Sequence, residues 1–284
     1  MESDTSGTGG VDWLARWAAM YDAERQQAEA VTAPEFAIGP DYWETQSARF
    51  AAATRRSPMP DAFVRFLLPR LRPDDTLIDI GAGTGRYAVP LARSVRQVLA
   101  VEPSPGMRRH MEDWLADERL TNVQARADGW PTFEPMRADI VIAPHVLYGV
   151  RDIRPFLEAM DAAATRGCYL LLGVRHPASF VAPFWQQFYG EPRLPLPGAL
   201  ECLCALHQIG VPAQLSTIDR SHPIVFADRD EALADLRFRL RFAPDAARDA
   251  EILRAIDAAG ETMPDGTIRL RAERPLAAVV WWEK

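Results

Sequence analysis

Short apolar segments that alternate with helix-length segments constrain the fold of this chain more than any other feature of its 284 residues. Strand-length apolar segments stand at TLIDI (76–80), QVLAV (97–101), NVQAR (122–126), DIVIA (139–143) and CYLLLGV (168–174), and helix-length segments fall between them at 86–95, 105–119 and 152–165. Strands that alternate with helices form right-handed βαβ units around a parallel sheet that is buried on both faces. We therefore predict an α/β fold with a doubly wound, mostly parallel sheet.

Helices are also predicted before the first strand. Trp13, Trp17 and Tyr21 recur at steps of four, which places them on one face of a helix. Two more helices are expected over 41–53 and 61–71. These expectations divide the chain into a disordered polar tail (1–10), an N-terminal helical cap (11–72) and a core (73–284).

The carboxyl-terminal part of the chain interrupts the alternation twice. Residues 177–214 are rich in proline and aromatic residues, and we expect them to form an inserted lid across the carboxyl edge of the sheet. A strand within SHPIVF precedes a second, helical insertion over 228–262, and RPLAAVVWWEK suits a last sheet strand. The lid carries aromatic residues that would form an apolar wall for a substrate, namely Phe180, Phe184, Trp185, Phe188 and Tyr189.

Composition and charge exclude several classes of protein. The formal net charge of −7 and the pI near 5.3 argue against a general nucleic-acid binder, because the phosphate backbone would repel the chain. Apolar segments all fall short of the roughly 20 residues that span a bilayer, and the acidic start MESDTSGTGG is unlike a signal peptide. We therefore expect a cytoplasmic protein with neither a nucleic-acid nor a membrane partner.

The three cysteines raise the question of a metal site. Cys202 and Cys204 lie close to His207 in ALECLCALHQIG, which would supply three ligands at an unusual spacing. Free cysteines are more often small buried hydrophobes, and this segment has the character of an apolar helix. We expect no metal and, with the odd Cys168, no disulfide framework.

Three glycines follow the first strand in DIGAGTGRYA (79–88). A strand that ends in glycines and opens into a helix offers free backbone amides and lets a ligand approach the backbone, beyond the carboxyl ends of the strands. Counted from Gly83, GTGRYA also fits the alanine-ended pattern of dinucleotide-binding loops. Asp79 would repel a pyrophosphate but would hold an amine, which favours an adenosine-bearing cofactor without phosphate.

Four segments resemble, in order and spacing, the motifs of the class I S-adenosylmethionine-dependent methyltransferases. DIGAGTG resembles the first motif, VLAVEPSPGM the second strand, ARADGWPTF the loop after the third strand, and ADIVIAPHVLYGV the fourth strand with its substrate-facing turn. The resemblance covers residues 60–175. It implies a Rossmann-like methyltransferase fold with a seven-stranded sheet, and S-adenosylmethionine as cofactor.

The resemblance also implies roles for single residues. Glu102 would accept hydrogen bonds from both ribose hydroxyls. Asp128 would accept one from the adenine amino group, Gly129 and Trp130 would close over the ring, and Arg49 would bind the methionine carboxylate. The full set expected at the cofactor is Asp79, Gly81, Ala82, Gly83, Gly85, Glu102, Pro103, Ser104, Met107, Asp128, Gly129, Trp130, Pro144 and Arg49.

Two histidines are candidates for catalysis. His145 follows the fourth strand and His176 the fifth, so both should reach the carboxyl edge, where either could take a proton from an acceptor near neutral pH. The turn APHVLY lacks the Asn- or Asp-Pro-Pro-aromatic sequence of methyltransferases that act on DNA adenine or glutamine amides. We expect a small organic acceptor, with O-methylation slightly favoured over N- or C-methylation.

Two other functions stay open from the sequence. One is a nicotinamide-dependent oxidoreductase, against which Asp79 and the absence of a Tyr-x-x-x-Lys pair argue, since Lys284 is the single lysine. The other is a protein that binds S-adenosylmethionine without catalysis, because methyl transfer requires no obligatory side chain.

Overall fold

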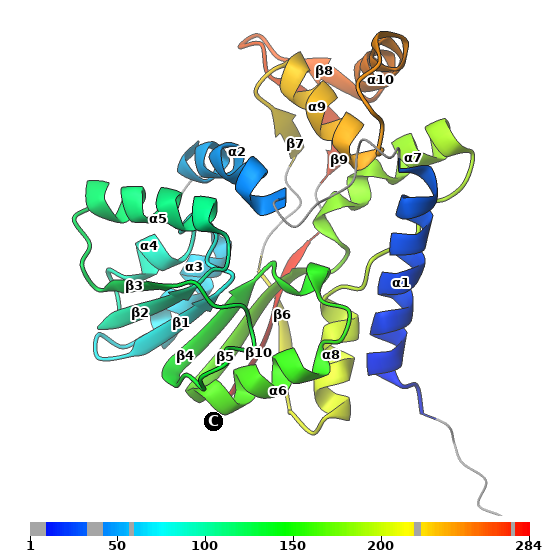
Figure 1. Ribbon diagram of the computed structural model, residues 1–284. Coiled ribbons are helices and arrows are strands. Elements are labelled where there is room, and N and C mark those ends of the chain that lie inside the picture. Colours follow the sequence, from blue (N-terminus) through cyan, green and yellow to red (C-terminus); the bar gives the residue numbers. More distant parts are fainter. Residues whose placement is uncertain (1–9, 33–41, 57–59, 219–222, 274–275) are drawn as a thin grey trace, which may run out of the picture.

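The central sheet has seven strands in the order β3-β2-β1-β4-β5-β10-β6 (Figure 1). The computed structural model describes residues 10–32, 42–56, 60–218, 223–273 and 276–284, so the expected tail lies outside the described residues apart from Gly10. The strands are β1 (Thr76–Ile80), β2 (Gln97–Val101), β3 (Val123–Arg126), β4 (Ala138–Pro144), β5 (Ala164–Gly173), β6 (Gln214–Thr217) and β10 (Ala277–Glu283). β1 to β5 are parallel, and β10 runs antiparallel to both β5 and β6. The predicted doubly wound, mostly parallel seven-stranded sheet is confirmed.

Helices cover both faces of this sheet, because alternate residues of its strands point to opposite sides. On one face Ile78 joins a buried cluster with Trp17 of α1, and on the other Leu77 joins a cluster with Met111 of α5. The first face is covered by α1 (Trp13–Val31), α6 (Arg154–Ala163) and α8 (Ala199–Gln208), and the second by α3 (Ala62–Leu67), α4 (Ala88–Leu91) and α5 (Pro105–Asp117). Among the described residues, none of the helices has both the length and the apolar character needed to cross a bilayer.

The N-terminal helices pack against different parts of the central domain. α1 packs against α8 on one face of the sheet, whereas α2 (Tyr42–Arg56) packs against α5. The contact with α5 is polar, because Glu44 accepts hydrogen bonds from the Gly106 amide and from Arg109. The segment expected as an N-terminal helical cap, residues 11–72, therefore contributes helices to different faces of the sheet.

The structure divides the expected lid over residues 177–214 into two parts. Its second half forms α8, whose Cys202 and Leu206 are buried against the central sheet, so it belongs to the core. Cys202 thus occupies the apolar helical position expected for it, and the ring Nε2 of His207 lies 2.7 Å from the Ala213 carbonyl oxygen. The first half forms a short 3-10 helix (Pro177–Val181) and α7 (Ala182–Tyr189), and it packs elsewhere.

A second unit lies beside the end of β5 and contains its own sheet and core (Figure 1). It comprises β7 (Pro223–Phe226), α9 (Arg229–Arg239), α10 (Ala246–Ala259), β8 (Gly260–Thr262) and β9 (Ile268–Glu273), with the antiparallel strand order β7-β9-β8. Phe180, Phe184 and Trp185 are buried in this core with Leu236 and Ile256. These aromatic residues, expected to line a substrate wall, mostly stabilise the second unit instead.

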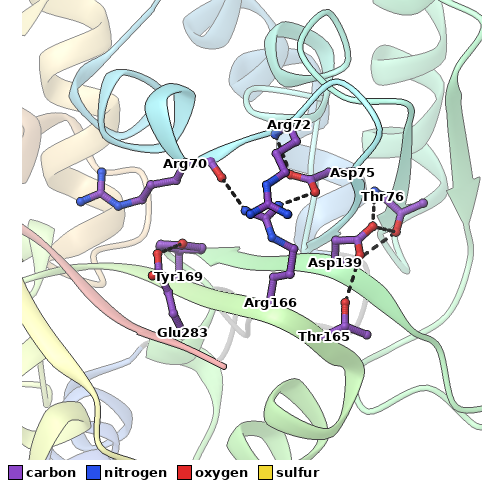
Figure 2. Close-up of polar contacts among 9 residues, drawn as sticks. All are labelled: Arg70, Arg72, Asp75, Thr76, Asp139, Thr165, Arg166, Tyr169 and Glu283. Carbon is purple, nitrogen blue, oxygen red and sulfur yellow. Dashed lines mark hydrogen bonds and ion pairs between the residues drawn. The ribbon is translucent and has the colours of Figure 1, made fainter.

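Polar contacts fasten the amino-terminal ends of three central strands, at the edge opposite the glycine turn (Figure 2). Asp139 of β4 accepts hydrogen bonds from the amide and the hydroxyl of Thr76 in β1, each at 2.8 Å, and from the Thr165 hydroxyl in β5 at 3.0 Å. Arg166 of β5 pairs with the buried Asp75 just before β1. The register of β1, β4 and β5 is thus fixed at one edge while the other edge is left to bind ligands.

The Arg166–Asp75 pair should contribute measurably to stability. We expect Arg166→Met to lower the free energy of unfolding by about 1–3 kcal/mol, because it leaves the Asp75 carboxylate buried with fewer partners. Arg154→Met is the matched control: it breaks the exposed pair with Glu158, and we expect a change within about 0.5 kcal/mol. Urea unfolding of both variants measures the difference, and equal losses would contradict a special role for Arg166.

Candidate cofactor and acceptor site

The glycine turn after β1 leaves space for a ligand at Gly83. Both the Gly81 and Ala82 amides donate to the Val101 carbonyl at the end of β2, at 2.8 and 3.1 Å, which ties the turn to the neighbouring strand. Gly83 has a φ of +57°, and of the atoms in the described residues a Cβ built on it would find only the Gly81 carbonyl oxygen within 4 Å, at 3.9 Å. A ligand can therefore approach the backbone at this residue closely.

Gly85 serves packing rather than ligand approach. A Cβ at this residue would lie 2.9 Å from Met111 Cγ and 2.9 Å from Val89 Cγ2, on α5 and α4. Its φ of +90° is also one that side-chain-bearing residues rarely adopt. The glycines predicted as one ligand-binding set thus have two roles: Gly83 leaves space for a ligand, and Gly85 allows α4 and α5 to pack against the turn.

Glu102 lies directly after β2 and reaches back to the glycine turn. Its Oε2 accepts from the Gly83 amide at 2.9 Å and its Oε1 from the Ser104 amide at 2.8 Å. The side chain is buried, and burial raises the pKa of Glu102 while these two amides oppose the rise. Each oxygen keeps a further lone pair, so the carboxylate is held in place and can still accept from a ligand's hydroxyls.

Asp79 is the most unusual group in the site. It is fully buried in β1, and among the described residues neither of its carboxylate oxygens has a hydrogen-bond partner of good geometry. Burial raises the pKa of Asp79 to about 8, the Ala88 amide opposes this rise, and Glu102 adds to it. A buried carboxyl group without a partner is costly. It is suited to receive a cation, such as an ammonium group, from a ligand.

The residues expected around an adenine follow β2 and β3. Ser104 caps α5 by accepting from the Met107 amide at 3.4 Å, and Met107 is buried. Asp128 is half-exposed, and its Oδ2 forms an ion pair with Arg126 Nε at 3.1 Å. The Trp130 indole donates to the Phe156 carbonyl of α6 at 3.2 Å, so its ring is anchored to a helix of the core. Ser104 and Asp128 lie at the predicted edge, whereas the contacts of Trp130 are those of a packing residue.

Arg49 forms an ion pair within the protein. Its guanidinium forms an ion pair with Asp235 of α9 at 2.6 Å, and Asp235 is buried and also pairs with Arg239. The expected clamp on a methionine carboxylate therefore competes with an ion pair already present. Asp235 belongs to the second unit, 186 residues further along the chain, so local sequence could not reveal the pairing.

His145, Tyr148 and His176 form one aromatic group at the carboxyl ends of β4 and β5. The His145 ring stacks on Tyr148 at 5.9 Å, and the His176 ring meets the edge of Tyr148 at 4.5 Å. His145 is exposed and has a φ of +61°, directly after Pro144, the buried last residue of β4. The structure thus brings together the two histidines that the sequence predicted.

The hydrogen bond at His176 gives it a role other than that of a base. The Ala178 amide donates to its Nδ1 at 3.0 Å, and burial lowers the pKa of His176 to about 4. The ring is therefore neutral at pH 7, with its single proton on Nε2. His176 can donate a hydrogen bond to a ligand, but to accept a proton it would have to give up the Ala178 contact.

A cavity of about 1060 Å³ lies next to this aromatic group. Tyr148 and His176 line it from the carboxyl edge of the sheet, together with residues of α1 and of α9. Pockets of several hundred Å³ suit small organic ligands. The cavity therefore offers a place for an acceptor beside the carboxyl ends of β4 and β5.

Together these features define a class of protein. A sheet of this order with a glycine turn and two buried carboxylates at the carboxyl ends of β1 and β2 is a Rossmann-like fold of the methyltransferase type. The family described as "Methyltransferase domain" matches residues 78–172. The chain thus contains a methyltransferase domain over residues 78–172, as the sequence motifs predicted.

The chain is similar to two curated proteins and to a solved structure. It is 31% identical over 151 residues to a ubiquinone biosynthesis O-methyltransferase from Methylocella silvestris, a match that covers 46% of this chain and 57% of that protein. It is 25% identical over 232 residues to an uncharacterized protein from Haemophilus influenzae, covering 78% and 84% of the two chains. A candidate methyltransferase from Bacillus halodurans shares the fold, with a TM-score of 0.51, 14% identity, and coverage of 79% of this chain and 98% of that one.

Asp79→Asn should make the stability of the protein less dependent on pH. Because the pKa of Asp79 is raised from 3.8 to about 8, the folded state keeps a proton that the unfolded state has lost between about pH 4 and about pH 8. This group therefore lowers the free energy of unfolding as the pH rises through that range, by at most about 1.4 kcal/mol per pH unit. We expect Asp79→Asn to be more stable than the wild type at pH 8 and similar to it near pH 4.

Asp139→Asn is the control of opposite sign. Hydrogen bonds from Thr76 lower the pKa of Asp139, so its carboxylate stabilises the fold above about pH 4 and that contribution is lost as the pH falls. We expect Asp139→Asn to be less stable than the wild type at pH 7. Denaturant unfolding at several pH values measures both variants, and parallel curves for Asp79→Asn and the wild type would contradict a raised pKa at Asp79.

Alanine substitutions should separate the two kinds of glycine. We expect Gly85→Ala to destabilise the fold by about 1–3 kcal/mol more than Gly83→Ala, because only its Cβ clashes with Met111 and Val89. We expect Gly83→Ala to weaken binding of S-adenosylhomocysteine, because its Cβ enters the space open to a ligand. Thermal unfolding and calorimetric titration measure the two effects, and full cofactor affinity in Gly83→Ala would mean that a ligand lies elsewhere.

Proposed function

We propose that this protein transfers a methyl group from S-adenosylmethionine to a small organic molecule, with oxygen slightly favoured over nitrogen or carbon as the accepting atom. One observation carries the proposal: two buried carboxyl groups, those of Asp79 and Glu102, lie beside the open backbone at Gly83. S-adenosylmethionine carries an ammonium group and two ribose hydroxyls, which match a lone buried acid and a second acid held by two amides. The O-methyltransferase among the similar proteins supports oxygen as the acceptor atom.

The chemistry at this site needs alignment more than reactive side chains. When bound, S-adenosylmethionine supplies a methyl group on a positively charged sulfur, and a lone pair of the acceptor forms the new bond to that carbon as the carbon–sulfur bond breaks. Asp79 and Glu102 would hold the ammonium and the ribose, which fixes the position of the donor. Holding two reactants in line can lower the barrier by several kcal/mol.

The two histidines would act differently on the acceptor. His176 presents its Nε2 proton, so it would orient an acceptor oxygen by donating a hydrogen bond. His145 is exposed and stacks on Tyr148, and it would take the proton released when a neutral hydroxyl is methylated. An acceptor that is already an anion would release no proton and would need no base.

Titration calorimetry tests the cofactor assignment. We expect S-adenosylmethionine and S-adenosylhomocysteine to bind, and Glu102→Ala to weaken both by at least about tenfold, since each hydrogen bond to a charged group is worth about 1.5–3 kcal/mol. Glu102→Gln keeps the shape of the side chain without its charge and should also weaken binding. Glu158→Ala, at an exposed residue of α6, is the control and should leave the affinity unchanged.

Two results of this experiment would reject the proposal. Unchanged affinity in Glu102→Ala would remove Glu102 from the cofactor site. Tighter binding of NAD or NADP than of S-adenosylhomocysteine would favour the oxidoreductase that the sequence left open. Release of S-adenosylhomocysteine during incubation with a panel of small hydroxylated acceptors would distinguish an active enzyme from a protein that only binds the cofactor.

A further inference from the structure

The cavity beside Tyr148 and His176 gathers positive charge in a chain that is negative as a whole. The chain carries a formal net charge of −7, yet the cavity is lined by six arginines and only three glutamates. The arginines come from α1, from the segment after β5, from the segment after α7 and from the end of α9, namely Arg16, Arg25, Arg175, Arg193, Arg239 and Arg241. Four separate parts of the chain thus place guanidinium groups around one space.

Internal ion pairs account for only some of these charges. Arg25 pairs with Glu29 at 2.9 Å, Arg193 with Glu24, and Arg239 with Asp235 at 2.6 Å. No carboxylate lies within ion-pair distance of Arg16 or Arg175 in the part of the chain that the structure describes. The third lining glutamate, Glu201, accepts from the Gly198 amide at the start of α8. Among the described residues, the cavity therefore keeps positive charge that no carboxylate compensates.

Arg175 is the cavity arginine closest in sequence to the carboxyl end of β5. It follows β5 and precedes His176, whose Nε2 proton is available to a ligand in the same cavity. Apolar side chains line other parts of the cavity, among them Met20, Leu196 and Phe238. The cavity thus combines cationic and neutral hydrogen-bond donors with an apolar surface.

We propose that the methyl acceptor is a small anionic molecule, with a carboxylate or phosphate group on an apolar body, and that Arg175 binds this group. Planar guanidinium groups match the oxygens of carboxylates and phosphates, and such charge-assisted hydrogen bonds are stronger than neutral ones. The uncompensated cations of the cavity would repel an amine and would favour an acid. This inference rests on the proposed methyl transfer, because it names the substrate class of the same site.

Matched probes distinguish an anionic acceptor from a neutral one. The probes are 4-hydroxybenzoate, its uncharged counterpart 4-hydroxybenzamide, and phenyl phosphate, each titrated by calorimetry into the full chain with S-adenosylhomocysteine present. We expect the acids to bind at least about tenfold more tightly than the amide. Added salt should lower the affinity for the acids and leave that for the amide unchanged. Comparison of 4-hydroxybenzoate with phenyl phosphate decides between a carboxylate and a phosphate.

Charge-neutralising variants locate the anion. We expect Arg175→Gln to lower the affinity for the two acids by about fivefold and to leave the affinity for the amide unchanged. The Arg16→Gln/Arg175→Gln double variant should lower the affinity for the acids further. Arg254→Gln is the control, because it removes the same charge from an exposed residue of α10 that does not line the cavity. Equal affinity for acid and amide, no saturable binding of either acid, or equal effects of Arg175→Gln and Arg254→Gln would overturn the proposal.

The titration of S-adenosylhomocysteine alone separates this inference from the proposed function. If S-adenosylhomocysteine binds through Glu102 but the acids do not bind, the methyltransferase proposal stands and the anionic acceptor is rejected. If the acids bind through Arg175 but S-adenosylhomocysteine does not bind, the cavity is an anion site and the proposed methyl transfer is rejected.

Discussion

The burial of the Asp79 carboxyl group between the central strands is the constraint on which the candidate site depends. A buried acid without a partner destabilises the free protein, and the same burial makes it a strong receptor for a ligand's ammonium group. Glu102 lies nearby and is held by the amides of Gly83 and Ser104, so its position is fixed before a ligand arrives. The burial of Asp79 lowers the stability of the free protein, as expected for a site that binds a positively charged cofactor.

The opposite edge of the sheet shows where rigidity comes from. Asp139 and Arg166 link the beginnings of β1, β4 and β5, so the strands arrive at the ligand edge in a fixed register. The glycine turn and the turn at His145 extend from strands that are already anchored. Both turns can therefore hold uncommon backbone angles without loosening the sheet.

The second unit helps to determine which side chains line the acceptor cavity. Phe180, Phe184 and Trp185 are buried in its core. Asp235 of its α9 pairs with Arg49, and Arg239 of the same helix lines the cavity. The aromatic segment that suggested an apolar substrate wall is thus mostly structural, and arginines from several elements line the space near the histidines. The chemistry expected of the acceptor changes accordingly, from a hydrophobic body alone to an apolar body with an anionic group.

The histidine pair shows how one hydrogen bond decides between two roles. Their placement after β4 and β5 followed from the strand pattern, and the structure does bring both rings against Tyr148. The amide of Ala178 then fixes the proton of His176 on Nε2, which makes this residue a donor. The backbone contact that selects the tautomer arises only when the chain turns into the 3-10 helix after β5.

The sequence by itself determined the parts of this protein that depend on local pattern. Five parallel strands, the glycine turn, and the places of Asp79 and Glu102 at strand ends follow from apolar periodicity and from residues a few positions apart. β6, β8 and β9 were not expected, because they are stabilised by pairing with strands far from them in the chain or within the second unit. The position of α8 in the core, the Arg49–Asp235 pair and the arginine-lined cavity were decided by tertiary structure alone. Each joins residues far apart in the chain, and burial and charge balance at such contacts depend on which elements the complete fold brings together.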